Sequence, residues 1–378
     1  MFSTGTRRRG RSKSRGRSRK RGRKGGSGAG VKALVVAGVA AGGWLGVQAW
    51  RGETTAPPPL SATPAAGLVG EAAPQAEGTP EATGAPAASP IGQRIEGPVP
   101  AELRGAVARA QQSRDPMAIN DLRRLVVEHP SSPEAEQAQQ ALTTVRETAQ
   151  RRAQAAKSPA DALREWTRVY FATVEAGPRK ALRPQLAKLV KAAFYAKGAT
   201  TNVAPYTVKS GDSLARIAKR QGTDYRLIKA LNGLTRDTIR IGQKLRIPQA
   251  KVRIVIFKND FELIALFGDH YLCSHDVATG KEDRTPEASF VIGNKIVKPD
   301  WYAPDGKKYK YGTEQNILGT RWMAFENTPE HQGFGIHGTK FPESIGTEAS
   351  MGCLRMRNEE VEVLFELIPP GTTVRIQR

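Results

Sequence analysis

The chain has 378 residues, which is too long for one compact domain and allows two or three. Its formal net charge is +22, but the excess of basic residues is uneven, because residues 1–32 carry thirteen lysines or arginines and no acid. Only two cysteines, Cys273 and Cys353, are present, which excludes a fold held together by a disulfide framework.

Residues 1–32 consist mainly of basic residues, glycine and serine. Such a segment cannot bury enough apolar surface to offset the entropy lost on ordering, so we expect a disordered basic tail. The simplest role of its charge is to hold the N-terminus on the inner side of a membrane. Arginine-rich runs can also bind phosphate groups, so contact with nucleic acid or anionic lipid is an alternative role.

An apolar run extends from residue 33 to residue 50 and is interrupted only by Gln48. At 1.5 Å per residue a helix of this length reaches roughly 27 Å, just enough to cross a bilayer core. We therefore predict a single transmembrane anchor with the N-terminus inside and the later domains outside. The alternative is a signal peptide cleaved after Ala49, and either interpretation exports the rest of the chain.

Residues 51–100 are rich in proline, alanine, glycine and threonine and predict a semi-extended linker. From residue 101 to residue 198 the pattern is helical. Ser132-Pro133 and Ser158-Pro159 each have the form of an N-cap followed by proline at the first helical position. We interpret this α-helical region as a spacer or scaffold.

Residues 205–249 show short strand patterns on either side of two helical ones. The most characteristic segments are Tyr206-Thr207-Val208-Lys209-Ser210-Gly211-Asp212-Ser213-Leu214 and Ile241-Gly242-Gln243-Lys244-Leu245-Arg246-Ile247-Pro248. They resemble a LysM module, which implies a small βααβ fold that binds the N-acetylglucosamine-containing glycan of peptidoglycan or chitin. Ser210, Gly211 and Asp212 are the expected glycan contacts, because a tight turn presents backbone N–H and C=O groups to a sugar. A module that only separates its neighbours is the alternative.

Residues 251–378 open with three strand candidates, 252–257, 262–267 and 271–277. Near the end of the chain, apolar residues at helical spacing predict a helix over 358–367. The last block is therefore expected to be a β-rich domain with a short helix.

The most informative pair in this block is His337 and Cys353, which lie sixteen positions apart. A thiol is a weak nucleophile at neutral pH until a base removes its proton, and a histidine brought close by the fold is the usual base. The small residues in Ser350-Met351-Gly352-Cys353 leave backbone N–H groups available to a developing oxyanion. His337-Gly338 followed by Ser350-Met351-Gly352-Cys353-Leu354-Arg355 resembles the catalytic motif of L,D-transpeptidases of the YkuD type.

This resemblance implies a mostly antiparallel β-sandwich and an enzyme that remodels peptidoglycan outside the bacterial cytoplasmic membrane, in the periplasm or wall space. Cys353 would attack the carbonyl that precedes the terminal D-Ala of a tetrapeptide stem, and His337 would be the base. The thioester formed would then pass its acyl group to an amine, in crosslinking or remodelling of the wall.

The resemblance also suggests roles for four further residues. The Gly338 carbonyl, helped by Ser350, would orient His337, and backbone N–H groups at Gly352 and Cys353 would hold the oxyanion. Arg355 would bind a substrate carboxylate, since its planar guanidinium matches one, although a structural salt bridge is the alternative.

Several alternatives remain open from the sequence. Met351 stands where many members of that family have a histidine, which leaves His337 as the only base in the motif. Cys273 and Cys353 could instead form a disulfide in an oxidising compartment. The domain could also be a carboxypeptidase of the same fold that uses water, or a non-catalytic peptidoglycan-binding tether. His270, His275 and His331 lack metal-ligand spacing with any cysteine or acid pair, and no Gly-rich phosphate loop occurs, so we predict neither a metal nor a cofactor.

Overall fold

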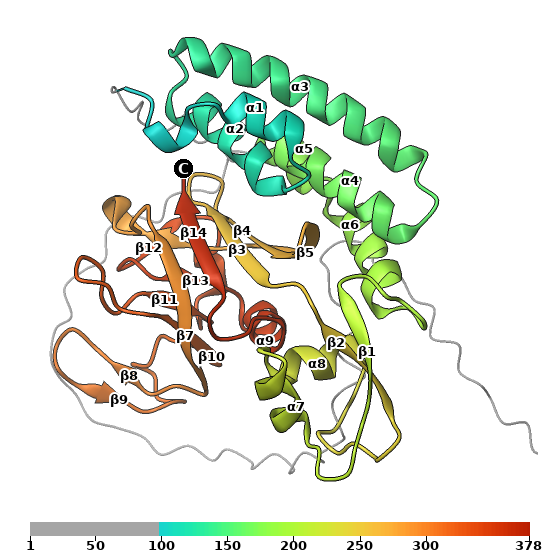
Figure 1. Ribbon diagram of the computed structural model, residues 1–378. Coiled ribbons are helices and arrows are strands. Elements are labelled where there is room, and N and C mark those ends of the chain that lie inside the picture. Colours follow the sequence, from blue (N-terminus) through green and yellow to red (C-terminus); the bar gives the residue numbers. More distant parts are fainter. Residues whose placement is uncertain (1–97) are drawn as a thin grey trace, which may run out of the picture. The chain divides into compact units, whose positions relative to one another are not determined.

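The computed structural model describes residues 98–378 (Figure 1). The basic tail 1–32, the anchor 33–50 and the linker as far as residue 97 lie outside the described residues, so those expectations stay predictions. Among the residues described, no helix is both long enough and apolar enough to cross a membrane.

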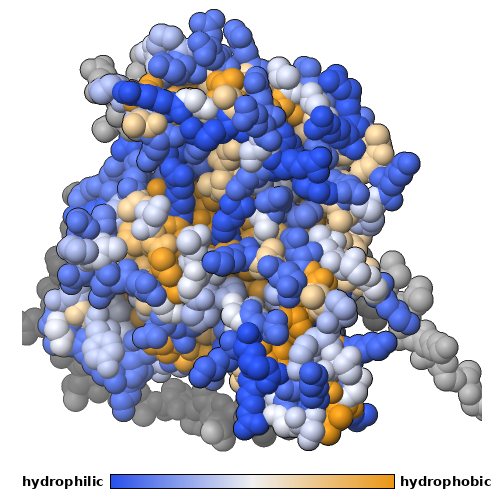
Figure 2. Space-filling model, viewed as in Figure 1, coloured by the Kyte–Doolittle hydropathy of each residue, from blue (hydrophilic) through white to orange (hydrophobic). Residues whose placement is uncertain are grey.

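The first described segment is helical, as predicted. It comprises a 3₁₀ turn Ala101–Leu103, α1 Ala106–Gln112, α2 Pro116–Glu128, α3 Pro133–Gln154, α4 Pro159–Ala172, α5 Ala176–Lys180, α6 Arg183–Val190 and a π-helical turn Lys191–Tyr195. The hydroxyls of Ser132 and Ser158 accept N–H bonds in the first turns of α3 and α4, which confirms both caps. The surface over the upper helices is mainly hydrophilic (Figure 2), in keeping with the polar outer positions of α3.

These helices share a hydrophobic core with the β-rich block. The ring of Phe171 in α4 lies 6.1 Å from that of Phe257, and the ring of Phe194 lies 5.4 Å from that of Phe267. All four side chains are almost fully buried. Of the two roles expected for this region, the packing fits a scaffold and not a detached spacer: its apolar faces are covered by the sheet, so the helices and the sheet stabilise each other.

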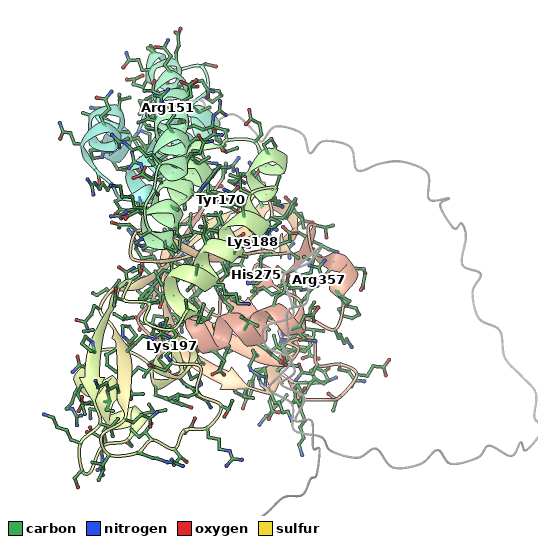
Figure 3. The ribbon with its side chains drawn as sticks, turned by 90° about the vertical axis from the view of Figure 1, so that its right-hand side faces the viewer. Arg151, Tyr170, Lys188, Lys197, His275 and Arg357 are labelled. Carbon is green, nitrogen blue, oxygen red and sulfur yellow. The ribbon has the colours of Figure 1, made fainter. Side chains whose placement is uncertain are left out.

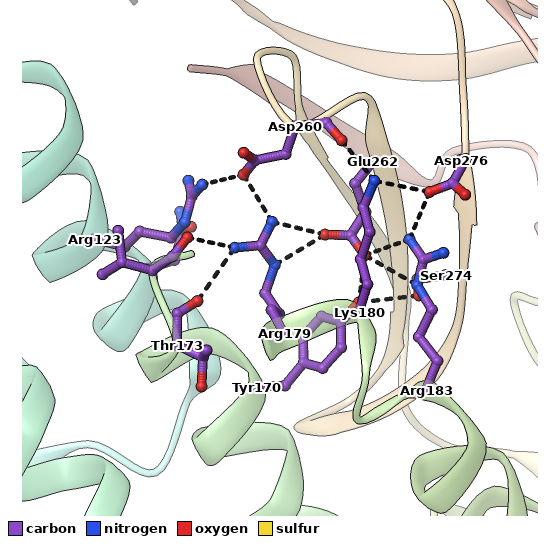
Figure 4. Close-up of polar contacts among 12 residues, drawn as sticks. Arg123, Tyr170, Thr173, Arg179, Lys180, Arg183, Asp260, Glu262, Ser274 and Asp276 are labelled. Carbon is purple, nitrogen blue, oxygen red and sulfur yellow. Dashed lines mark hydrogen bonds and ion pairs between the residues drawn. The ribbon is translucent and has the colours of Figure 1, made fainter. Parts of the chain in front are cut away.

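A buried polar cluster lies at the same contact (Figure 4). The Glu262 carboxylate, with no exposed surface, accepts hydrogen bonds from the Tyr170 hydroxyl at 2.5 Å and from Arg179 Nε at 2.9 Å. Arg183 Nη2 also donates to it, at 2.5 Å. Arg179 is itself fully buried and also contacts Asp260 at 2.7 Å. The hydroxyl of Tyr170, which is labelled in Figure 3, also lies 3.0 Å from the Ser274 hydroxyl of β5, so this side chain joins α4 to the sheet.

The next unit has the predicted βααβ order: β1 Val203–Thr207, α7 Leu214–Arg220, α8 Tyr225–Leu231 and β2 Lys244–Pro248, with β1 and β2 antiparallel. A small core of its own includes Leu214, Ile217 and Ile228. Leu227 and Leu231, on another face of α8, belong to the larger core. The helix α8 thus contributes residues to both cores.

The remaining strands are β3 Val252–Phe257, β4 Glu262–Phe267, β5 His270–Asp276, β6 Thr279–Gly280, β7 Ser289–Val297, β8 Trp301–Tyr302, β9 Lys308–Tyr309, β10 Arg321–Phe325, β11 Gly335–His337, β12 Glu348–Ser350, β13 Leu354–Arg355 and β14 Thr373–Gln377. Eight of them form one curled sheet in the order β13-β11-β10-β7-β14-β3-β4-β5. The pairs β14–β3 and β11–β13 are parallel, and the other pairs of this sheet are antiparallel.

The predicted β-sandwich needs correction. The mostly antiparallel character is confirmed, but in the described chain one large sheet curls on itself and three two-stranded sheets, β1-β2, β12-β6 and β8-β9, accompany it. The helix α9, Asn358–Leu367, has the predicted bounds and packs against β10 and β11 through Val361, Leu364 and Phe365, which have no exposed surface.

Candidate active site

Parallel pairing of β11 with β13 brings the two motif residues together. Ile336 lies opposite Leu354 and His337 opposite Arg355, so Cys353, directly before β13, lies beside the start of β11. The Cys353 thiol donates to the Gly333 carbonyl, with sulfur and oxygen 3.7 Å apart, and not to His337. Catalytic hydrogen bonds often tighten only when substrate is bound, so this geometry is compatible with a thiol–imidazole pair.

His337 is held in one tautomer. Its side chain is buried, and Nδ1 lies 2.5 Å from the Gly338 carbonyl oxygen. A carbonyl can only accept, so Nδ1 carries the proton and Nε2 keeps its lone pair. Burial lowers the pKa of His337 to about 4; the Gly338 carbonyl opposes this shift, and the charge of Arg355 adds to it. The imidazole is therefore neutral at pH 7 and available as a base.

The half-buried Cys353 thiol is protonated at rest. Burial raises its pKa to about 11, although a backbone hydrogen bond at Gly335 and the charge of Arg355 act in the opposite direction. A neutral thiol therefore stands near a neutral imidazole in place of a preformed thiolate–imidazolium pair. A thiol in this state would need a base in order to act as a nucleophile.

The loop before the thiol is fixed by Ser350. Its hydroxyl accepts the Gly352 N–H at 3.0 Å and donates to the Cys353 carbonyl at 2.6 Å. Two expectations are corrected here: Ser350 shapes this loop and makes no hydrogen bond to His337, and the Gly352 N–H already has a partner. The Cys353 N–H remains as the candidate oxyanion donor.

Glycine at position 352 is required by the backbone. Its φ of +131° lies in a region that other residues rarely adopt, and an added Cβ would lie 2.7 Å from the Phe334 ring. Glycine is therefore needed here because of the backbone conformation and the Phe334 ring.

Arg355 is buried and has no carboxylate partner. Its Nε has no hydrogen-bond partner, and no ion pair of Arg355 occurs among residues 98–378. Burial lowers its pKa, and the neighbouring Cys353 has the opposite effect. The structural salt bridge considered from the sequence is therefore not found in the described chain.

The comparisons with known proteins agree with these observations. Residues 251–376 match the family model of the YkuD L,D-transpeptidase catalytic domain, and residues 206–248 match that of the LysM domain. The Bacillus subtilis protein YqjB, named as an L,D-transpeptidase, is 38% identical over 125 residues, which cover 32% of this chain and 69% of the relative. The chain belongs to the L,D-transpeptidase family.

A second relative covers more of the chain. The Bacillus licheniformis protein YkuD, also named as an L,D-transpeptidase, is 32% identical over 179 residues, or 45% of this chain and 97% of the relative. An L,D-transpeptidase structure from Mycobacterium smegmatis aligns over 37% of this chain and 65% of its own length, with 16% identity and a TM-score of 0.29. The assignment to the family rests on the sequence matches.

The LysM residues expected to meet a glycan have different surroundings. Asp212 is engaged by its own domain, since its carboxylate accepts from Lys209 N–H at 2.8 Å, the Tyr206 hydroxyl at 2.7 Å and Arg220 at 2.6 Å. Ser210 and Gly211 are exposed. The turn that precedes β2 lies against Val208, because the Gly242 N–H donates to the Val208 carbonyl. Ile241 is 72% exposed, and the sequence analysis did not single it out.

Two positioning side chains of the L,D-transpeptidase domain were also missed. Asn358 accepts from the Thr320 N–H at 3.0 Å and donates to the Thr339 carbonyl at 2.8 Å, which fixes the chain just after His337 and Gly338. Thr285 contacts the Gly352 carbonyl at 2.9 Å. Their partners Gly352 and Thr320 lie 67 and 38 positions away in the sequence, so these contacts are identified by the fold.

Both cysteines are free thiols in the structure. Within residues 98–378 no three His, Cys, Asp or Glu side chains are grouped so that they could hold a metal ion.

Proposed function

We propose that this chain is a peptidoglycan L,D-transpeptidase in which Cys353 is the nucleophile and His337 the general base. The observation that carries the proposal is the contact of His337 Nδ1 with the Gly338 carbonyl, which leaves Nε2 as the basic nitrogen, on the strand that pairs with the one following the thiol. The substrate would be a tetrapeptide stem, cleaved before its terminal D-Ala.

The low pKa of His337 and the high pKa of Cys353 constrain the order of events. A free thiolate–imidazolium pair is costly in the empty site, so His337 takes the thiol proton as the sulfur–carbon bond forms. The Cys353 N–H donates to the resulting oxyanion. His337 then returns the proton to the departing D-Ala amine as the carbon–nitrogen bond breaks, which leaves a thioester on Cys353.

The acyl acceptor defines the reaction class. The purified full-length chain is incubated with disaccharide-tetrapeptide, and the products are separated by mass. A crosslinked dimer with release of D-Ala supports transpeptidation, whereas release of D-Ala with a tripeptide product alone supports a carboxypeptidase. If neither product forms and no acyl adduct is found, the chain is a non-catalytic peptidoglycan-binding tether.

Arg355 is proposed to bind a carboxylate of the stem, because it is buried close to the thiol without an acidic partner. Lysine keeps the charge but lacks the planar, two-pronged donor geometry. Arg355→Lys should therefore raise KM for the tetrapeptide by about 10-fold or more. An unchanged KM, measured on a variant with normal thermal stability, would contradict this role.

The LysM domain is proposed to bind the peptidoglycan glycan through the exposed turn at Ser210 and Gly211 together with Ile241. Apolar side chains beside exposed backbone polar groups suit the faces and hydroxyls of a sugar. Ile241→Ser should weaken binding to isolated peptidoglycan several-fold without changing thermal stability, since the side chain contributes little to the core. Unaltered binding would favour a LysM domain that only separates its neighbours.

Residues 33–50 are proposed to anchor the enzyme in the cytoplasmic membrane with the catalytic domain outside, on the strength of their apolar length. Tethering would raise the effective concentration of wall substrate. Protease digestion of intact cells should remove the catalytic domain only after the outer layers are permeabilised. Recovery of the chain in the soluble cytoplasm would refute the anchor.

A further inference from the structure

The Thr285 side chain bridges two backbone groups beside Cys353. Its hydroxyl accepts the Gly280 N–H at 2.7 Å and donates to the Gly352 carbonyl at 2.9 Å. The residue is 1% exposed, so both bonds are shielded from water. A buried hydroxyl that both accepts and donates fixes its partners more strictly than a solvated one.

The carbonyl that Thr285 holds belongs to the peptide bond between Gly352 and Cys353. In a planar trans peptide the C=O and the N–H point in opposite directions. Fixing the Gly352 carbonyl therefore fixes the direction of the Cys353 N–H. Because Ser350 already occupies the Gly352 N–H, the Cys353 N–H is the donor that an oxyanion on the attacked carbonyl would need.

The packing at this point allows the peptide little freedom to turn. A Cβ added at Gly280 would lie 2.8 Å from the Gly352 Cα, so the two backbones are in close contact. A Cβ added at Gly352 would lie 2.7 Å from the Phe334 ring and 3.0 Å from the Arg284 carbonyl oxygen. The bond from Thr285 selects the carbonyl direction within this narrow space.

We propose that Thr285 is a positioning residue that aims the Cys353 N–H at the oxyanion. The inference rests on the proposed function, since it takes Cys353 to be the nucleophile. Thr285 acts through the peptide and does not touch the substrate, so its effect falls on reactions that form an oxyanion.

The main chain at Thr285 is held independently of its hydroxyl. The buried Lys258 ammonium donates to the Thr285 carbonyl at 3.1 Å and pairs with Glu287 at 3.1 Å. Thr285→Val therefore keeps shape and backbone anchoring while removing both side-chain hydrogen bonds. Thr285→Ser keeps the hydroxyl and is the matched control.

Two reactions of the same thiol separate oxyanion positioning from thiol reactivity. A carbapenem acylates the thiol through a tetrahedral oxyanion as its ring amide bond breaks, whereas iodoacetamide alkylates it by displacing iodide and forms no oxyanion. The full-length chain carries Cys273→Ser so that Cys353 is the only thiol. Thr285→Val should slow acylation about 10- to 100-fold, leave alkylation within about 2-fold and be rescued by Thr285→Ser.

Acylation of Thr285→Val at the wild-type rate would overturn the inference, and so would an equal fall in both reactions, which indicates a disturbed thiol. Cys353→Ala tests the proposed function separately. If that variant still releases D-Ala from disaccharide-tetrapeptide, Cys353 is not the nucleophile, whatever Thr285 does.

Discussion

Replacing His337 with glutamine should lower the rate of D-Ala release by about 10²- to 10⁴-fold, the usual contribution of a general base. Glutamine is polar and of similar length, but its amide cannot take the thiol proton. With burial holding the pKa of Cys353 at about 11, no significant thiolate exists at neutral pH to react without a base. Release of D-Ala is measured by mass spectrometry under saturating tetrapeptide.

The matched control is His275→Gln, which alters a half-buried histidine on β5 whose ring lies 3.5 Å from the Glu360 carboxylate of α9. That variant should keep its rate within about 3-fold, because it touches no reacting group. Equal losses in the two variants would mean that the effect of His337→Gln is structural.

The pH dependence gives a second check on the same histidine. With a pKa of about 4, His337 becomes protonated and useless as a base only when the pH falls through 4. The kcat/KM profile should therefore rise with pH up to about 4 and stay flat through neutrality. A fall in kcat/KM as the pH decreases from 7 to 6 would show that burial does not lower the pKa of His337 in the free enzyme.

Replacing Glu262 with glutamine should lower the free energy of unfolding by roughly 3–5 kcal/mol, the cost of breaking a buried ion pair from one side. Glu262 and Arg179 are both fully buried at 2.8 Å, so the guanidinium would be left without its main counter-charge. Asp260 compensates only in part, because it is partly exposed and also serves Arg123. Urea unfolding of the full-length chain measures the change.

An exposed ion pair within one helix is the matched control. Asp161 pairs with Arg164 on α4 and has 54% of its side chain exposed, so Asp161→Asn should cost less than about 1 kcal/mol. If Glu262→Gln cost no more than Asp161→Asn, the contact between the helices and the sheet would not depend on the polar cluster. A large cost would indicate that the helices and the L,D-transpeptidase domain unfold together.

Local signals in the sequence predicted local structure well. The strands β3 and β4 and the helix α9 have the bounds expected from alternation and helical spacing. Ser132 and Ser158 cap α3 and α4 because an N-cap needs only its own first turn. The LysM domain and the His337–Cys353 pair were recognisable because their motifs are short and contiguous.

Contacts between distant parts of the chain were not accessible in this way. Glu262 and Arg179 are 83 residues apart in the sequence, so the residues around each of them do not indicate that the two side chains are buried together. Asp212 was expected to contact a glycan, but its carboxylate accepts hydrogen bonds from Arg220 and Tyr206. The Gly352 N–H was misassigned because its use by Ser350 depends on the geometry of the folded loop.

The central claim is tested most directly by the mass of the enzyme itself. The full-length chain is mixed with disaccharide-tetrapeptide, and the reaction is quenched in acid. After proteolytic digestion, the mass of the peptide that contains Cys353 is measured by mass spectrometry. We predict a thioester adduct of the disaccharide-tripeptide on Cys353, formed as D-Ala appears and absent in Cys353→Ala. Release of D-Ala by Cys353→Ala, or an adduct on any other residue, would contradict Cys353 as the nucleophile.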